Sequence, residues 1–460
     1  MNTIYQYFFL EWRIFIMAQN LFETVQNTRI SLRQQQLHTI FEQFDRQTMH
    51  LTAAQRIEKY KKMADSPFRY FRGSAYLYYY DTTNFPSAFH TPEERPTWIM
   101  GDMHMDNFGA FQNENGDIVY DVNDFDEGYV GSYLYDILRM SISIALYLEE
   151  QLLDESAQQQ AIEHFLQAYL KQLKRFQAKK DDALSLVFTQ ENTKGPIKRV
   201  LKKLEKRQRT ELIDDITEIQ ENGERVFIWS DEIHPIDNAL FEKITALVPN
   251  YHVKDIAIKH GSGTASIGLD RFYLLVDSHK DALNGKDLVL EMKEVRLAIP
   301  AYFLPYHTPF WSQYEHQGAR VVGTQKAMHH LQDPHLAYVT MDDKDYYIRE
   351  RSPYKRKVKP KNYRSLEDYY TTTEIMGKIA AKIHARADLD YSTIFTYHSE
   401  DEILKQVRGH EEIFLEAIVL QAMRYKHIVN TDYKLFTDYV QQFEAQHPDV
   451  SDEHQPIVAK

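Results

Sequence analysis

The chain has 460 residues, 43% of them hydrophobic, and this length exceeds what one hydrophobic core usually serves, so we expect two or more lobes. Its 54 basic and 67 acidic residues leave a formal charge of −13, which argues against a general nucleic-acid binder because phosphate backbones attract basic surfaces. The sequence contains no cysteine, which excludes disulfides, thiolate metal sites and a cysteine nucleophile, and we expect a cytoplasmic protein.

The first segment is similar to a targeting peptide only superficially. Residues 4–17 are largely apolar, but Glu11 and Arg13 interrupt them and no basic region precedes them. We therefore expect neither a signal peptide nor a membrane span. Met17 is a second candidate start, which would make residues 1–16 an extension.

Helical spacing dominates the next part of the chain. Apolar residues recur at this spacing over residues 20–62, which predicts a helical N-terminal arm over residues 1–62. Residues 66–82 are dense in aromatic side chains and follow a Ser-Pro start signal, as a short buried helix or strand would. We place a first lobe, which carries the catalytic loop described next, at residues 63–245.

A loop motif within this lobe is Trp98-Ile-Met-Gly-Asp102-Met-His104-Met-Asp-Asn107-Phe-Gly109. A carboxylate at Asp102 can accept or orient the proton of an acceptor hydroxyl, and the amide oxygen of Asn107 can complete a magnesium shell. Taken alone, the pair also fits a turn in which both side chains cap the backbone. We expect His104 to be a hydrogen-bonded structural histidine and not a metal ligand.

A carboxylate-rich segment follows. Residues 117–127 predict an apolar strand that ends in Asp121, Asp124 and Asp126, and we expect these carboxylates to share one face. So many like charges are costly unless a cation neutralises them, which predicts a magnesium site, with a solvated surface strand as the alternative. Asp136, twelve residues after Asp124, is expected to be a buried anchor or an N-terminal cap.

The spacing of apolar residues predicts an amphipathic helix over 155–177. Further along the chain, this spacing changes from that of helices to that of strands. Residues 253–276 predict a strand, a glycine turn and a second strand, and the turn contains Gly261, Ser262, Gly263 and Gly268. Glycine permits close approach of backbone amides to phosphate oxygens, although a plain hairpin turn explains the same residues. The turn lacks the Lys-Ser/Thr ending of a Walker loop and joins strand to strand, which excludes Walker and Rossmann sites.

The next predicted strand, residues 287–296, directs one lysine toward this turn. Strand alternation puts Leu288, Leu290 and Met292 on one face of this strand. It puts Val289, Glu291 and Lys293 on the opposite face. A glycine hairpin followed by an inward lysine is the kinase way of covering and pairing phosphates. A solvated strand lysine is the alternative.

A small lobe and a helical C-terminal part complete the expected organisation. A helix over 314–331 and a strand pair over 337–340 and 346–351 belong to the small lobe, which we place at residues 246–360. Residues 361–460 are expected to form helices that pack on the first lobe.

Together these motifs resemble a large bacterial family of unknown function, and they are similar to those of aminoglycoside and choline phosphotransferases, members of the protein-kinase-like fold. The matching residues are 101–109, 121–127, 293–296, 318–322 and 383–386, and the resemblance covers about residues 50–390. It implies a two-lobed α+β protein that binds ATP with magnesium and transfers a phosphoryl group to a hydroxyl. The acceptor is open; a small molecule fits, and we expect no nucleic-acid or membrane partner.

The resemblance also implies a role for each site residue. Asp102 is the catalytic base in this comparison. The implied magnesium ligands are Asn107, Asp124 and, in reserve, Asp126. The implied nucleotide-binding residues are Gly261, Ser262, Gly263 and Gly268 over the phosphates and Lys293 on the α- and β-phosphates.

The order of the motifs differs from that of a kinase. Kinase-like phosphotransferases place the glycine loop and the lysine before the catalytic loop, whereas here they follow it by about 160 residues. A circular permutation explains this order, with the cut between a helix over 374–386 and the catalytic loop. The expected fold is a circularly permuted kinase-like fold, with the catalytic-loop lobe first, the glycine-loop lobe second and helices returning to the first lobe.

Two other functions stay open. A nucleotidyl transferase acting on protein side chains would use the same site with the ATP reversed. A nucleotide-binding pseudokinase with a regulatory role would fit the lack, within residues 318–331, of the glutamate that kinases pair with their lysine. Gln325 and Glu294 are the candidate substitutes for that glutamate.

Overall fold

The chain divides into two units, one helical and one of mixed α/β type. The computed structural model describes residues 2–113, 115–206, 210–261, 263–278, 287–331, 333–351 and 356–448, and for 2–18 and 210–212 the backbone alone. The first unit is built from the described residues up to Tyr70 and from His427 onward, and the second from Phe71–Lys426. No helix in the described ranges combines the length and apolarity needed to cross a bilayer.

The first unit consists of helices, as the spacing over residues 20–62 predicts. Its elements are α1 (Asn2–Phe41), the π-helical η1 (Glu42–Thr48), α2 (Ala53–Met63) and the later turns of α14 (Glu411–Gln446). The Tyr60 ring lies 5.9 Å from the Phe41 ring and 5.6 Å from the Phe436 ring. Buried Lys59 donates to buried Asp45 at 2.5 Å, so these two charges are paired with each other.

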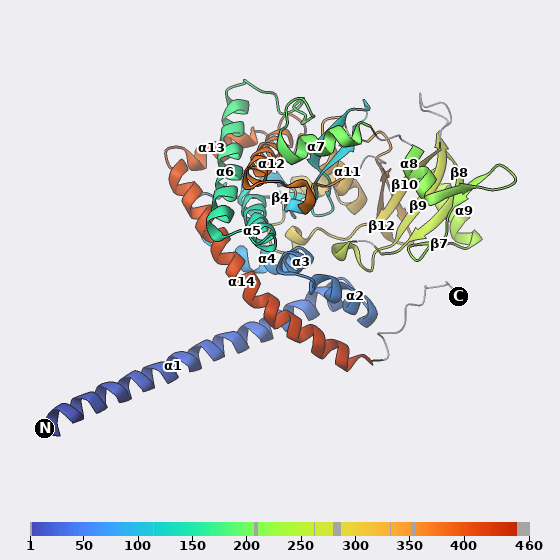
Figure 1. Ribbon diagram of the computed structural model, residues 1–460. Coiled ribbons are helices and arrows are strands. Elements are labelled where there is room, and N and C mark those ends of the chain that lie inside the picture. The colour runs from blue at the N-terminus through green and yellow to red at the C-terminus, as the bar shows by residue number, and fades with distance from the viewer. Residues whose placement is uncertain are drawn as a thin grey trace. The chain divides into compact units, whose positions relative to one another are not determined.

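Helices α5 (Leu134–Glu150), α6 (Glu155–Gln177) and α12 (Leu366–Arg386) pack together within the second unit (Figure 1). The helix expected over 155–177 is confirmed as α6, whose first turn is capped by Asp154 accepting from the Ala157 N–H at 2.8 Å. The other α-helices in the described ranges are α3 (Pro67–Gly73), α4 (Ala75–Thr82), α7 (Gly195–Leu204), α8 (Thr210–Ile216), α9 (Asn238–Leu247), α10 (Thr308–Gln313), α11 (Gln317–Met328) and α13 (Ser399–Val407). The aromatic segment 66–82 is thus helical.

A six-stranded antiparallel sheet forms the other part of the second unit (Figure 1). Its strand order is β11 (Ala337–Met341), β12 (Lys344–Glu350), β10 (Asp287–Glu294), β9 (Arg271–Ser278), β8 (Tyr251–Lys259) and β7 (Ile233–Pro235). The predicted strand, glycine turn and strand are confirmed as β8 and β9, and the predicted strand pair as β11 and β12. Three short ladders pair β1 (Thr97–Ile99) with β4 (Tyr129–Gly131), β2 (Phe108–Gln112) with β3 (Ile118–Val122), and β5 (Thr217–Ile219) with β6 (Arg225–Phe227).

The two faces of this sheet differ in chemistry, as the alternation in β10 predicts. One face, which we call the outer face, carries Leu288, Leu290 and Met292. These side chains are packed with Ile244 of α9 and with Val248, the residue that follows α9. The opposite face, which we call the inner face, carries Val289, Glu291 and Lys293. Its apolar part is packed against Ile216, Phe227 and Ile233. The inner face therefore combines an apolar part with a charged part.

Close packing of α6 and α12 predicts a strong effect of substitution at Gly377. A Cβ atom there would lie 2.2 Å from the Phe165 carbonyl oxygen, which is backbone and cannot shift cheaply. We expect Gly377→Ala to lower the free energy of unfolding by about 1–3 kcal/mol, measured by urea denaturation. Gly263→Ala is the control, because a Cβ there meets nothing within 4 Å and its φ of −57° suits alanine. Equal midpoints for both variants would contradict the packing.

Candidate active site

The Asp102 loop follows β1 and is fixed by a buried carboxylate. The backbone N–H groups of Met100 and Gly101 donate to Asp136 at 2.6 and 2.9 Å, and Asp136 lies 3.2 Å from Nε2 of His384. Asp136 is therefore the buried anchor expected from sequence. Gly101 has a φ of +83°, and a Cβ there would lie 2.0 Å from the carbonyl oxygen of Glu127, so glycine is required at this turn.

Asp102 is held in an ion pair. Nε of Arg139, on α5, donates to Asp102 Oδ1 at 2.6 Å, and the Arg139 guanidinium lies 4.4 Å from the ring centroid of Phe71. Burial acts to raise the pKa of the Asp102 carboxyl, but the charge of Arg139, with a smaller contribution from neighbouring His104, outweighs it and holds that pKa well below its ordinary value. Asp102 is therefore ionised at any working pH.

The side-chain amide of Asn107 uses its nitrogen, and not its oxygen, for a hydrogen bond within the Asp102 loop. Its Nδ2 donates to the Asp102 carbonyl at 2.9 Å, which leaves Oδ1 as the acceptor end. The Asn107 carbonyl accepts from the Asn123 N–H at 3.0 Å, so the Asp102 loop lies beside the segment after β3. His104 is buried, and burial lowers its pKa, as suits a neutral structural histidine.

The expectation that Asp121, Asp124 and Asp126 share one face is wrong. Strand β3 ends at Val122, so strand alternation no longer governs the two later carboxylates. Asp121 forms an ion pair with buried Lys382 of α12, whereas Asp126 forms one with Lys293 of β10. The three carboxylates are thus divided between two buried lysines and the loop between β3 and β4.

The ion pair of Lys293 and Asp126 joins the sheet to the loop between β3 and β4, which we call the acidic loop. Of the two substitutes considered for the kinase glutamate, Glu294 pairs with Lys344 at 3.1 Å, and the amide oxygen of Gln325 is buried with no hydrogen-bond partner among the described residues. Asp126, which the resemblance implied as a reserve magnesium ligand, is thus the partner of Lys293. Within the described residues its Oδ1 is buried and has no hydrogen-bond partner.

Arg320 of α11 connects the acidic loop to the segment that follows β10. Its Nη1 donates to the carbonyls of Asp126 and Gly128 at 2.7 and 3.0 Å, and its Nη2 donates to the Arg296 carbonyl at 2.9 Å. Arg296 in turn donates to the carbonyl of Ile267, in the glycine turn, at 3.4 Å. A continuous set of contacts therefore runs from the glycine turn to the acidic loop.

Positive backbone angles mark the glycine turn. Gly261 and Gly268 have φ values of +72° and +78°, where glycine is favoured, whereas Gly263 has a φ of −57° and open space around its Cβ position. Ser262, implied as a nucleotide-binding residue, lies outside the described residues.

The donor set of the two loops suits a hard cation. The amide oxygen of Asn107 and the carboxylates of Asp124 and Asp126 are oxygen ligands of the kind magnesium prefers, and the buried Oδ1 of Asp126 lacks a partner in the described chain. The residues present therefore fit a magnesium ion.

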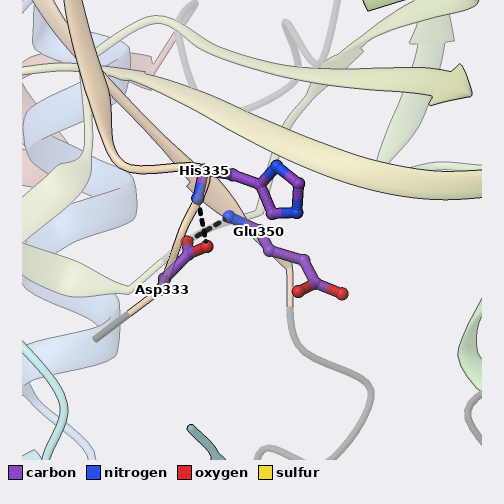
Figure 2. Close-up of side chains that lie close together, drawn as sticks. All are labelled: Asp333, His335 and Glu350. Carbon is purple, nitrogen blue, oxygen red and sulfur yellow. Dashed lines mark hydrogen bonds between the residues drawn. The ribbon is translucent and has the colours of Figure 1, made fainter. Parts of the chain in front are cut away.

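A second group of ligand-type side chains lies at the end of β12 (Figure 2). Potential ligand atoms of Asp333, His335 and Glu350 lie within 4.8 Å of one another. However, the Asp333 carboxylate accepts from the backbone N–H groups of His335 and Glu350 at 2.8 and 2.5 Å, and Nδ1 of His335 contacts the Tyr251 hydroxyl at 2.8 Å. Asp333 thus connects the segment before β11 to the end of β12, which is a structural role.

Sequence reasoning missed two buried cations, Arg139 and Lys382. Both side chains are fully buried in helices, and each neutralises a motif carboxylate. The available signal was a basic residue surrounded by apolar neighbours in a predicted helix, because such a charge needs a buried partner.

An antiparallel sheet whose lysine strand meets the carboxylate-bearing loop between β3 and β4 defines a mixed α/β protein with a carboxylate-rich site. The chain belongs to the family described as "Uncharacterized protein conserved in bacteria (DUF2252)", whose profile matches residues 52–439. The expected membership of a bacterial family of unknown function is thereby confirmed. Searches of curated proteins and of solved structures gave no match.

Glu127 beside this site predicts a pH effect on stability. Burial raises the pKa of its carboxyl to about 7, from an ordinary value of 4.5. Between these pH values the unfolded chain has released the proton that the folded chain keeps, so the free energy of unfolding falls as the pH rises. We expect Glu127→Gln to remove this part of the fall, measured by denaturation at about pH 5 and about pH 8. Identical pH slopes in the wild type and the variant would refute the assignment.

Proposed function

We propose that the second unit is a circularly permuted kinase-like phosphotransferase that uses ATP and magnesium and transfers a phosphoryl group to a hydroxyl. The order β8, glycine turn, β9, lysine strand β10, helix α11, β11 and β12 supports this, because kinase small lobes place these elements in the same order. The observation that carries the proposal is the ion pair of Lys293 with Asp126, which brings the lysine strand to the acidic loop beside Asp102.

Asp102 would orient the acceptor hydroxyl. The acceptor oxygen forms a bond to the γ-phosphorus, the bond from that phosphorus to the β-bridging oxygen breaks, ADP leaves, and the hydroxyl proton passes to the Asp102 carboxylate. Because Arg139 keeps the pKa of Asp102 low, this carboxylate is a weak base and acts chiefly by positioning the hydroxyl.

Magnesium would be held by Asn107, Asp124 and Asp126, and when bound it neutralises charge on the nucleotide phosphates. Asn107 contributes through an amide whose donor end is already engaged, and Asp126 through an oxygen that has no other partner in the described chain. Lys293 fixes the position of Asp126.

A second candidate is nucleotidyl transfer to a protein side chain. It needs the ATP to lie reversed, with its terminal phosphates against the sheet. The observation in its favour is the charged part of the inner face, where Arg271, Arg349 and Lys293 come together.

Asp124→Asn tests the metal site. A ligand at a hundredfold its dissociation constant stabilises the folded state by about 2.7 kcal/mol, so wild-type protein should unfold at a higher temperature with ATP and magnesium. We expect the variant to lose the magnesium-dependent part of this shift, because an amide replaces a charged ligand. Asp438→Asn, an exposed aspartate of the first unit, is the matched control. An unchanged shift in Asp124→Asn would remove this residue from the metal site.

Asp102→Asn tests the transfer step. The amide keeps the size of the side chain but loses the negative charge that orients the hydroxyl and receives its proton, so we expect the transfer of label from ATP to fall by about a hundredfold or more. ATP binding should persist, as measured by the thermal shift. Unfolding of the ligand-free variant should be recorded as well, because Arg139 loses its charged partner. Transfer at the wild-type rate would show that Asp102 is not the acceptor-orienting group.

A further inference from the structure

Four cationic side chains line the charged part of the inner face, and we call them the cation row: Lys293, Arg271, Arg349 and Arg351. The strand register puts Lys293 opposite Arg271 and Glu291 opposite Arg349. The N–H of Arg351 donates to the Val289 carbonyl at 2.8 Å, which continues the row along β10.

The cation row carries more positive charge than its partners neutralise. Among the described residues, its ion-pair partners are Glu291, at 2.7 Å from Arg349 and 3.3 Å from Arg271, and Asp126. In the same part of the chain, Nε of Arg271 and Nε of Arg351 are buried and have no hydrogen-bond partner. Buried cationic donors without acceptors are costly, and phosphate oxygens are the acceptors that arginine binds best.

The same face offers little to a purine base. Its apolar residues, among them Val289, are already packed against the segment that contains Phe227 and Ile233. Its aromatic rings are also covered, since the Arg351 guanidinium lies 4.9 Å from the Tyr273 ring centroid. A neutral base binds through stacking and apolar contact, so the charged part of this face favours phosphates over a base.

We propose that the cation row is a phosphate subsite that receives the β- and γ-phosphates of ATP, with the base directed away from the sheet. This inference rests on the nucleotide site of the proposed function, and at that site it replaces phosphoryl transfer by the second candidate, nucleotidyl transfer. The acceptor oxygen then bonds to the α-phosphorus, the bond from that phosphorus to the bridging oxygen breaks, diphosphate leaves, and the hydroxyl proton passes to Asp102.

The binding test uses the full chain with magnesium and four probes: ATP, inorganic triphosphate, AMP and adenosine. We expect inorganic triphosphate to bind and to compete with ATP. Arg271→Gln and Arg351→Gln should each weaken both ligands by about tenfold, because each removes a charge-assisted hydrogen bond. Arg351→Lys, which keeps the charge, should lose less, and it serves where a Gln variant folds poorly. Lys243→Gln on α9, exposed and paired with Asp342, is the matched charge control.

The reaction test compares ATP labelled at the α-phosphorus with ATP labelled at the γ-phosphorus. Incorporation of α-label into protein, reduced by about tenfold in Arg351→Gln at ATP concentrations below saturation, is the result expected. Incorporation of γ-label, with ATP affinity unchanged in both Gln variants, would overturn the phosphate subsite and leave the proposed function standing. If wild-type protein binds neither ATP nor inorganic triphosphate, the subsite and the proposed function both fail.

Discussion

The buried guanidinium of Arg320 is the constraint on which the candidate site depends. A charge in the interior is tolerated only when its donors are satisfied, and Arg320 donates to the carbonyls of Asp126, Gly128 and Arg296. Burial lowers its pKa to about 10, so it stays charged near neutral pH. These bonds fix α11 and the segment after β10 on the acidic loop. The approach of Lys293 to Asp126 follows from that connection.

The pairing of Asp102 with Arg139 fits a catalyst that positions its substrate. A carboxylate with a strongly lowered pKa is a poor base, but transfer through a loose transition state depends chiefly on alignment and charge. The buried Arg139 side chain holds Asp102 from one side, and Asp136 holds the backbone of the same loop. Rigidity of the carboxylate is thus obtained at the expense of its basicity.

The local patterns of the sequence predicted much of this architecture. Alternation in β10 was sufficient to direct Lys293 to the inner face, and the glycine turn, the helix over 155–177 and the anchoring role of Asp136 were likewise accessible. Pairings between residues far apart in the chain could not be predicted from these local patterns. Asp126 meets Lys293 across 167 positions and Asp121 meets Lys382 across 261, and nothing in local spacing distinguishes the two carboxylates. Only the end of β3 at Val122 separates their directions.

The polarity of the inner face originates in β10 itself. Glu291 lies two residues before Lys293 and so faces the same way, and it is nearly fully buried between Arg271 and Arg349. Without this carboxylate, the neighbouring cations would repel one another across the sheet and the face would be costly to bury. With it, the repulsion is reduced but not cancelled, and an arginine N–H remains for another acceptor. A face of this kind is stable before an anion arrives and becomes better satisfied once one binds, which is the thermodynamic requirement of a preorganised phosphate site.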